Sequence, residues 1–183
     1  MTPVRHNQSG RVALCGVLGA LSVVVLLAGG MLQIGTYAAP MFAAFLTIPA
    51  LEEYGPRAAL LQYAVVSVLA VLLVPDLELV FFYLLVMGYY PAVRRLLQRI
   101  PGKVLRGSAK LLLFNGATAA VYGFLAALLG PAVWDELLAD GTALLAVFVL
   151  LGNLCFWLCD RATAQLTLVY RVAVRPKLRH ILR

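Results

Sequence analysis

The sequence predicts an all-α membrane protein, a bundle of six transmembrane helices with both termini in the cytoplasm. Its 183 residues are 63% hydrophobic and 13% charged, and the mean hydropathy of +0.93 exceeds that of soluble domains. Six apolar stretches follow one another along the chain. Lys and Arg gather in alternate connections between them, as in multi-pass proteins. We therefore expect a single integral membrane domain over residues 1–183.

The first apolar stretch, residues 12–30, follows a polar tail at residues 1–10 and carries no charge. At a rise of about 1.5 Å per residue, it is long enough to cross a hydrocarbon core of about 30 Å. It also exceeds the apolar region of about 7–15 residues found in a secretory signal peptide. Small residues gather on one side of this helix: Ala13, Gly16 and Ala20, with Gly19 beside them. Such a face lets another helix approach closely in lipid, either within this bundle or from another protein.

The second stretch, residues 34–51, contains Pro40 and Pro49 and cannot form one undisturbed helix. We expect a broken or re-entrant segment there. Irregular backbone at membrane depth must be covered by protein or by a watery cavity, so this stretch is a candidate lid over a ligand. A tight turn over Glu52–Arg57 should follow it.

The remaining spans are predicted at residues 58–74, 77–97, 107–129 and 142–170. Turns are expected at Pro75–Glu78 and over Trp134–Gly141. The densest basic stretch is the connection from Arg94 to Lys110, and the tail at residues 171–183 is basic as well.

The connections separate by charge. Arg5, Arg11, Arg57, the basic connection and the tail arginines all fall on one side of the six predicted spans. The turns on the opposite side hold no Lys or Arg and carry only acidic residues: Asp76, Glu78, Asp135, Glu136 and Asp140. The positive-inside rule then places both termini in the cytoplasm.

Several classes of chemistry find little support in the sequence. The net charge of +7 is explained by basic residues that flank the membrane spans. The sequence contains no soluble module in which basic and aromatic residues are interleaved, so nothing indicates nucleic-acid binding. The three cysteines lie in apolar stretches, and the two histidines sit near opposite termini. We therefore expect no metal site, no cofactor and no catalytic residues. Glu52-Glu53-xxx-Arg57 matches a string of the CAAX-type intramembrane proteases, but no predicted span holds the histidine that such an enzyme needs.

Polar residues inside the predicted spans form two stripes. Asn115, Thr118 and Tyr122 share one face of the fifth span, and Asn153, Trp157 and Asp160 share one face of the sixth. The stripes serve either as hydrogen bonds between helices or as ligand contacts. A carboxylate costs about 2.5–3.5 kcal/mol at the centre of a membrane helix, so Asp160 should have a partner. Lys110 is the expected one, in a structural ion pair.

The first span with its leading arginine, RVALCGVLGALSVVVLL, the six-span size and the basic ends resemble the substrate-binding S component of an energy-coupling factor (ECF) transporter. In that family an alanine-rich face of the first helix docks on a coupling subunit, which sits on two ABC-type ATPases. The matching face here comprises Ala13, Gly16, Gly19 and Ala20. The resemblance implies a subunit of the bacterial cytoplasmic membrane that captures a vitamin-like micronutrient from outside.

The resemblance also implies a solute pocket built from the loop after the first span and from the fourth to sixth spans. The matching positions here are Gln33, Thr36, Tyr37, Tyr83, Thr118, Tyr122 and Asn153. Because the outer turns hold no Lys or Arg, we expect a neutral or weakly cationic solute. A membrane scaffold or assembly factor is the alternative, and it would have the small-residue face without a pocket. A secondary transporter should show paired broken helices, and only one interrupted stretch is visible.

Overall fold

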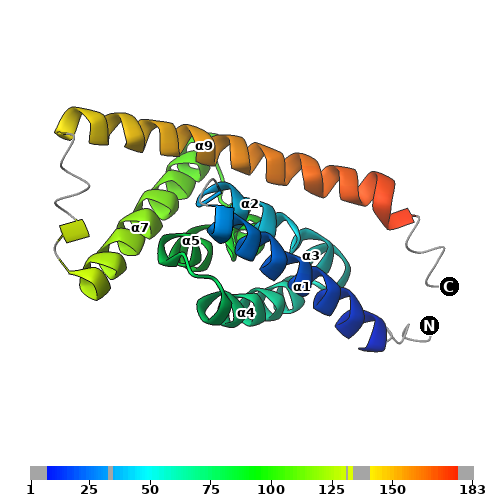
Figure 1. The fold of residues 1–183 in the computed structure, drawn as a ribbon. Helices are drawn as coiled ribbons and strands as arrows, with labels where there is room; N and C mark the ends of the chain where they lie inside the picture. The colour runs from blue at the N-terminus through cyan, green and yellow to red at the C-terminus, as the bar shows by residue number, and fades with distance from the viewer. Residues whose placement is uncertain (1–7, 33–34, 131, 134–140, 177–183) are drawn as a thin grey trace.

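The computed structural model describes residues 8–32, 35–130, 132–133 and 141–176, and all regular structure in this part of the chain is helical. Figure 1 shows the arrangement. The helices are α1 (Gln8–Leu32), α2 (Ala38–Phe45), α3 (Ile48–Tyr54), α4 (Pro56–Leu73), α5 (Leu77–Phe82), α6 (Tyr90–Leu97), α7 (Lys103–Leu129) and α9 (Thr142–Val169), with π-helical turns at Tyr83–Met87 and Tyr170–Val174.

Five helical segments of the described chain are long and apolar enough to cross a membrane. They are Gly10–Leu32, Pro56–Leu73, Leu77–Leu97, Lys103–Leu129 and Ala143–Val174. The fold is therefore that of an all-helical, multi-pass membrane protein. The start of α1 and the end of α9 lie on the same side of the molecule (Figure 1).

The second apolar stretch is the exception among the predicted spans, because it forms two helices too short to cross a membrane separately. As its prolines predicted, it is broken: α2 ends at Phe45, and α3 begins at Ile48 with Pro49 in its first turn. Between them, Thr47 Oγ1 donates a hydrogen bond of 2.7 Å to the carbonyl of Ala44. Thr47 is 2% exposed, so the break is covered by protein, as irregular backbone in a membrane requires.

Close packing around α1 depends on residues without bulk. A methyl group on Gly29 would overlap the side chain of Ala39 in α2, and one on Gly19 would meet Val66 of α4 at 3.6 Å. Close approach of these helices lets buried side chains of α1, α2, α4 and α5, including Leu26, form one hydrophobic cluster. A second cluster joins α2 and the segment after α5 to α7 and α9.

The stretch from α5 to α6 is not a regular helix. The amide of Gly88 donates to the carbonyl of Tyr83 at 2.7 Å, which widens the helix by one residue over Tyr83–Met87. The hydroxyl of Tyr63 in α4 donates to the carbonyl of Leu84 at 2.7 Å, so a carbonyl within the widened turn is satisfied. A methyl on Gly88 would meet the Tyr63 ring at 2.7 Å, and only glycine fits between them.

Helices α7 and α9 cross near the start of α7 and diverge toward the Gly130 and Gly141 ends (Figure 1). At the crossing, Phe114 and Phe156 stack with ring centroids 4.5 Å apart. Most side chains of α9 face away from the rest of the protein. The divergence creates room for a cleft on the side away from the start of α1.

Candidate functional site

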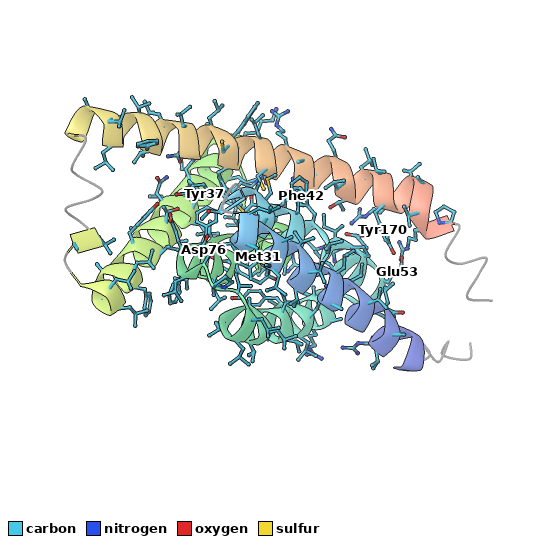
Figure 2. All side chains as sticks on the ribbon, in the orientation of Figure 1. Met31, Tyr37, Phe42, Glu53, Asp76 and Tyr170 are labelled. Carbon is cyan, nitrogen blue, oxygen red and sulfur yellow. The ribbon has the colours of Figure 1, made fainter. Side chains whose placement is uncertain are left out.

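A cleft of about 1110 Å³ lies between α5, α7, α9 and the segment that leads into α2. Its polar end is built from the residues just before α2 and at the start of α5, together with α7. Figure 2 places Tyr37 and Asp76 at this end and Glu53 and Tyr170 at the other end of the molecule. The walls away from the polar end are apolar and aromatic, with Phe82, Phe114, Phe148 and Phe156 among the lining side chains.

Three side chains from separate segments meet at the polar end. The hydroxyls of Tyr37 and Tyr122 lie 2.7 and 3.0 Å from Oε1 of Glu78. The two hydroxyl oxygens lie 3.1 Å from each other. Tyr37 also packs edge-on against Phe82, with ring centroids 5.1 Å apart. The cluster therefore connects α5, α7 and the residue before α2 in one arrangement.

Asp76 stands beside this cluster and begins α5. Its Oδ1 accepts a hydrogen bond of 3.1 Å from the amide of Leu79, which satisfies a donor in the first turn of the helix. Its Oδ2 lies 3.3 Å from Oγ1 of Thr36. Both oxygens of Asp76 therefore have partners that fix the start of α5 and the residues after α1.

Four of the predicted pocket residues line the cleft: Thr36, Tyr37, Thr118 and Tyr122. The Oγ1 atom of Thr118 is buried and has no hydrogen-bond partner among the described residues. Gln33 lies outside the described residues. Asp76 and Glu78 line the cleft too. They were predicted in the turn at the start of the fourth span and not as part of the pocket.

Two predicted pocket residues lie elsewhere. Tyr83 is fully buried and packs against Tyr63 with ring centroids 5.9 Å apart, because it continues the face of α5 that carries Leu79 into the first hydrophobic cluster. Asn153 exchanges hydrogen bonds of 2.8 and 3.1 Å with Asn115. Asn115 lines the cleft, whereas Asn153 does not and joins α9 to α7.

The predicted docking face of α1 is divided. Ala13, Gly16 and Ala20 are exposed, and nothing lies within 4 Å of the position that a Gly16 side chain would take. Gly19 is buried and faces α4 inside the protein, so it does not share the exposed face of the other three residues. The exposed residues Ala13, Gly16 and Ala20 are called the small-residue strip below.

Asp160 on α9 has the expected neighbour and two more. Its Oδ2 lies 2.6 Å from Nζ of Lys110, and its Oδ1 lies 2.7 Å from Nε of Arg94. The hydroxyl of Tyr90 donates to the same Oδ1 at 2.6 Å. This cluster joins α6, α7 and α9 near the aromatic floor of the cleft, where Phe156 packs against Tyr90 with ring centroids 5.1 Å apart.

A second ion-pair cluster lies near the end of α9. Glu52 and Glu53 belong to the last turn of α3, so the predicted tight turn is confined to Gly55, whose φ of 84° suits glycine. The buried carboxylate of Glu52 binds Arg95 and Arg171, the latter with Nε at 2.6 Å from Oε2. Glu53 binds Arg175 at 3.1 Å. Burial raises the pKa of Glu52, but hydrogen bonds from Arg171 and Arg95 outweigh burial and hold that pKa below its usual value.

Among the described residues, no group of three or more His, Cys, Asp or Glu side chains has the arrangement to hold a metal ion. The acidic residues expected between the last two spans lie outside the described part of the chain, as does Trp134.

Comparison with known proteins finds no relative. No protein-family model matches the chain, and neither does any curated protein or solved structure. The site is therefore interpreted from the residues of this chain.

Proposed function

We propose that this protein is the substrate-binding subunit of an ECF-type importer in a bacterial cytoplasmic membrane. In this proposal it captures a small organic, vitamin-like solute from outside and docks on a coupling subunit that carries two ABC-type ATPases. The cleft is the observation that carries the proposal. A volume of about 1110 Å³, aromatic walls and a few polar groups at one end are the usual features of a small-molecule site.

The proposed topology has six spans with both termini in the cytoplasm, the α2–α3 pair serving as the second. Arginines around α3 and the end of α9 then lie on the cytoplasmic side, and the acidic end of the cleft lies outside. This placement is supported by the position of the two charge clusters at opposite ends of the molecule. Asp76 and Glu53, labelled in Figure 2, belong to one cluster each. A solute would enter the cleft where α7 and α9 diverge.

The small-residue strip is the proposed docking surface for the coupling subunit. Gly16 and Ala20 are one helical turn apart and exposed, and α1 has no side-chain bulk there to keep a second helix at a distance. In lipid, close backbone approach is a main source of helix association. An assembly factor would use the same strip, but such a role does not account for the cleft.

The proposal assigns no reaction to this chain. Glu52 and Glu53, the acidic pair of the protease-like string, are both bound by arginines. Neither carboxylate lines the cleft. This arrangement favours a structural use of the string and leaves ATP hydrolysis to the partner subunits.

Native mass spectrometry of the purified protein tests whether the cleft holds a solute. Protein made in cells grown on complete medium should retain a small organic molecule. Thr118→Trp should lose it, because Thr118 lines the cleft and the larger indole would fill space that the solute needs. Ala119→Trp is the matched control, since Ala119 is exposed on the same helix and should leave retention unchanged. A wild-type protein without a retained molecule, or equal retention by Thr118→Trp, contradicts the proposal.

A further inference from the structure

Only one of the two carboxylate oxygens of Glu78 has hydrogen-bond partners among the described residues. Oε1 accepts from the hydroxyls of Tyr37 and Tyr122, which explains how the three segments are held together. Oε2 has no hydrogen-bond partner in the described part of the chain, although Glu78 lines the cleft. A structural role accounts for the first oxygen and leaves the second available to a ligand.

The cleft contains negative charge and no compensating cation. Its described lining includes the carboxylates of Glu78 and Asp76 and no Lys, Arg or His. The oxygens of Asp76 are occupied by Leu79 and Thr36. Both acidic residues are half-buried, and a cation placed beside such a carboxylate interacts favourably with it.

The surroundings of Glu78 also suit a cation with an apolar body. Tyr37 and Tyr122, whose hydroxyls contact its carboxylate, both line the cleft, and aromatic side chains attract cations. Phe82, Phe114 and Phe156 provide apolar surface further along the cleft. The buried, unpartnered hydroxyl of Thr118 offers one hydrogen bond to a polar atom of the same ligand.

Resting on the proposed function of the cleft, we propose that its solute is an organic cation with an aromatic or apolar body. Glu78 is the counter-charge of the cationic group, and Tyr37 and Tyr122 position the Glu78 carboxylate and contribute aromatic faces. Neutral and anionic solutes of similar size should bind more weakly.

Three probes of nearly the same shape test the charge preference: phenethylamine, phenethyl alcohol and phenylacetate. Binding is measured by saturation-transfer NMR and titration on the purified chain in nanodiscs of zwitterionic lipid, with protein-free nanodiscs subtracted. The wild type should bind phenethylamine tighter than phenethyl alcohol by about tenfold or more, as a charge-assisted hydrogen bond implies, and phenylacetate most weakly.

Glu78→Gln keeps an acceptor for both tyrosines and removes the charge. It should abolish the preference for phenethylamine and leave the affinity for phenethyl alcohol within about twofold, since the uncharged contacts persist. Glu53→Gln, a matched change at the other end of the molecule, should keep the preference. Equal or tighter binding of phenylacetate, a preference that survives Glu78→Gln, or no binding of any probe would overturn the inference. No partner subunit is present in the assay, so its result is independent of whether the chain assembles with ATPases.

Discussion

Asp160 is contacted by three side chains from two other helices. Lys110, Arg94 and Tyr90 all reach its two oxygens, and the side chains of Asp160 and both cations are largely buried. Such a cluster can be costly to assemble, yet it is far more costly to break, because removing one member leaves an uncompensated charge. Asp160 therefore fixes how α6, α7 and α9 meet below the cleft.

Asp160→Asn should lower the free energy of unfolding by about 3 kcal/mol or more, because two cations lose their counter-charge. The measurement is SDS titration of the protein in mixed micelles. In a Lys110→Met background the same substitution should cost less, since only Arg94 is then left unpaired. An unchanged unfolding curve, or an equal cost in both backgrounds, would contradict this account of the cluster.

At the scale of one residue, the sequence predicted half of this cluster. Lys110 was expected because an aspartate in a membrane helix needs a partner and because it lies on the neighbouring span. Arg94 and Tyr90 were not expected. Their side of the helix depends on the widened turn after α5, and that turn is specified by the contact between Gly88 and the Tyr63 ring of another helix. A tertiary contact of this kind leaves no periodic signal in the sequence.

Helix α3, the second helix of the interrupted stretch, contacts residues at and beyond the end of α9. Its last turn presents Glu52 to Arg95 of α6 and to Arg171, while Glu53 binds Arg175. The hydroxyl of Tyr170 lies 3.4 Å from Oε1 of Glu53. These contacts hold the final helical residues against the body of the protein.

The contribution of Glu52 to stability should depend on pH. Because its pKa is lower in the folded protein than in the unfolded chain, the stabilisation is complete above the unfolded value of about 4.3 and is lost as the pH falls through the folded value. The measurement is the difference in unfolding free energy between the wild type and Glu52→Gln. This difference should be constant above about pH 5 and should shrink below about pH 4. A difference that grows on acidification would give the wrong sign and would refute the role of these ion pairs.

At the scale of elements, the prolines predicted the break in the second apolar stretch correctly, and the structure adds where it falls. The predicted turn over Glu52–Arg57 was too wide, because polar residues at the end of a stretch do not distinguish a turn from the last turn of a helix. Here Glu52 lies in the last turn of α3, buried against two arginines, and the chain reverses only at Gly55.

The whole molecule combines a closely packed half with an open one. Helices α1 to α5 enclose small residues and leave little space, whereas α7 and α9 diverge and line the cleft. The sequence predicted the helical class and six spans, and five of these correspond to helical segments long and apolar enough to cross a membrane, because apolar length is set locally. The cleft could be predicted only in part. Thr118 and Tyr122 were visible as a stripe, but Glu78 became part of the site through folding of α5 against α7.

The two surfaces of the proposed importer subunit are separate. The cleft lies between α5, α7 and α9, and the small-residue strip lies on the exposed face of α1. Changes on the strip should therefore affect assembly with partner subunits without altering the cleft. This separation makes the role of the strip directly testable.

The most direct measurement is recovery of ATP-hydrolysing partners with the tagged chain, purified in mild detergent from the membranes in which it naturally occurs. The wild type should bring ATPase subunits with it. Gly16→Leu/Ala20→Leu should lose them while still folding, because bulk on the strip blocks close helix approach. Ala119→Leu/Gly123→Leu, the same spacing on an exposed face of α7, should retain them. Absence of ATPases from the wild-type sample, or their undiminished recovery with Gly16→Leu/Ala20→Leu, would contradict the proposed function.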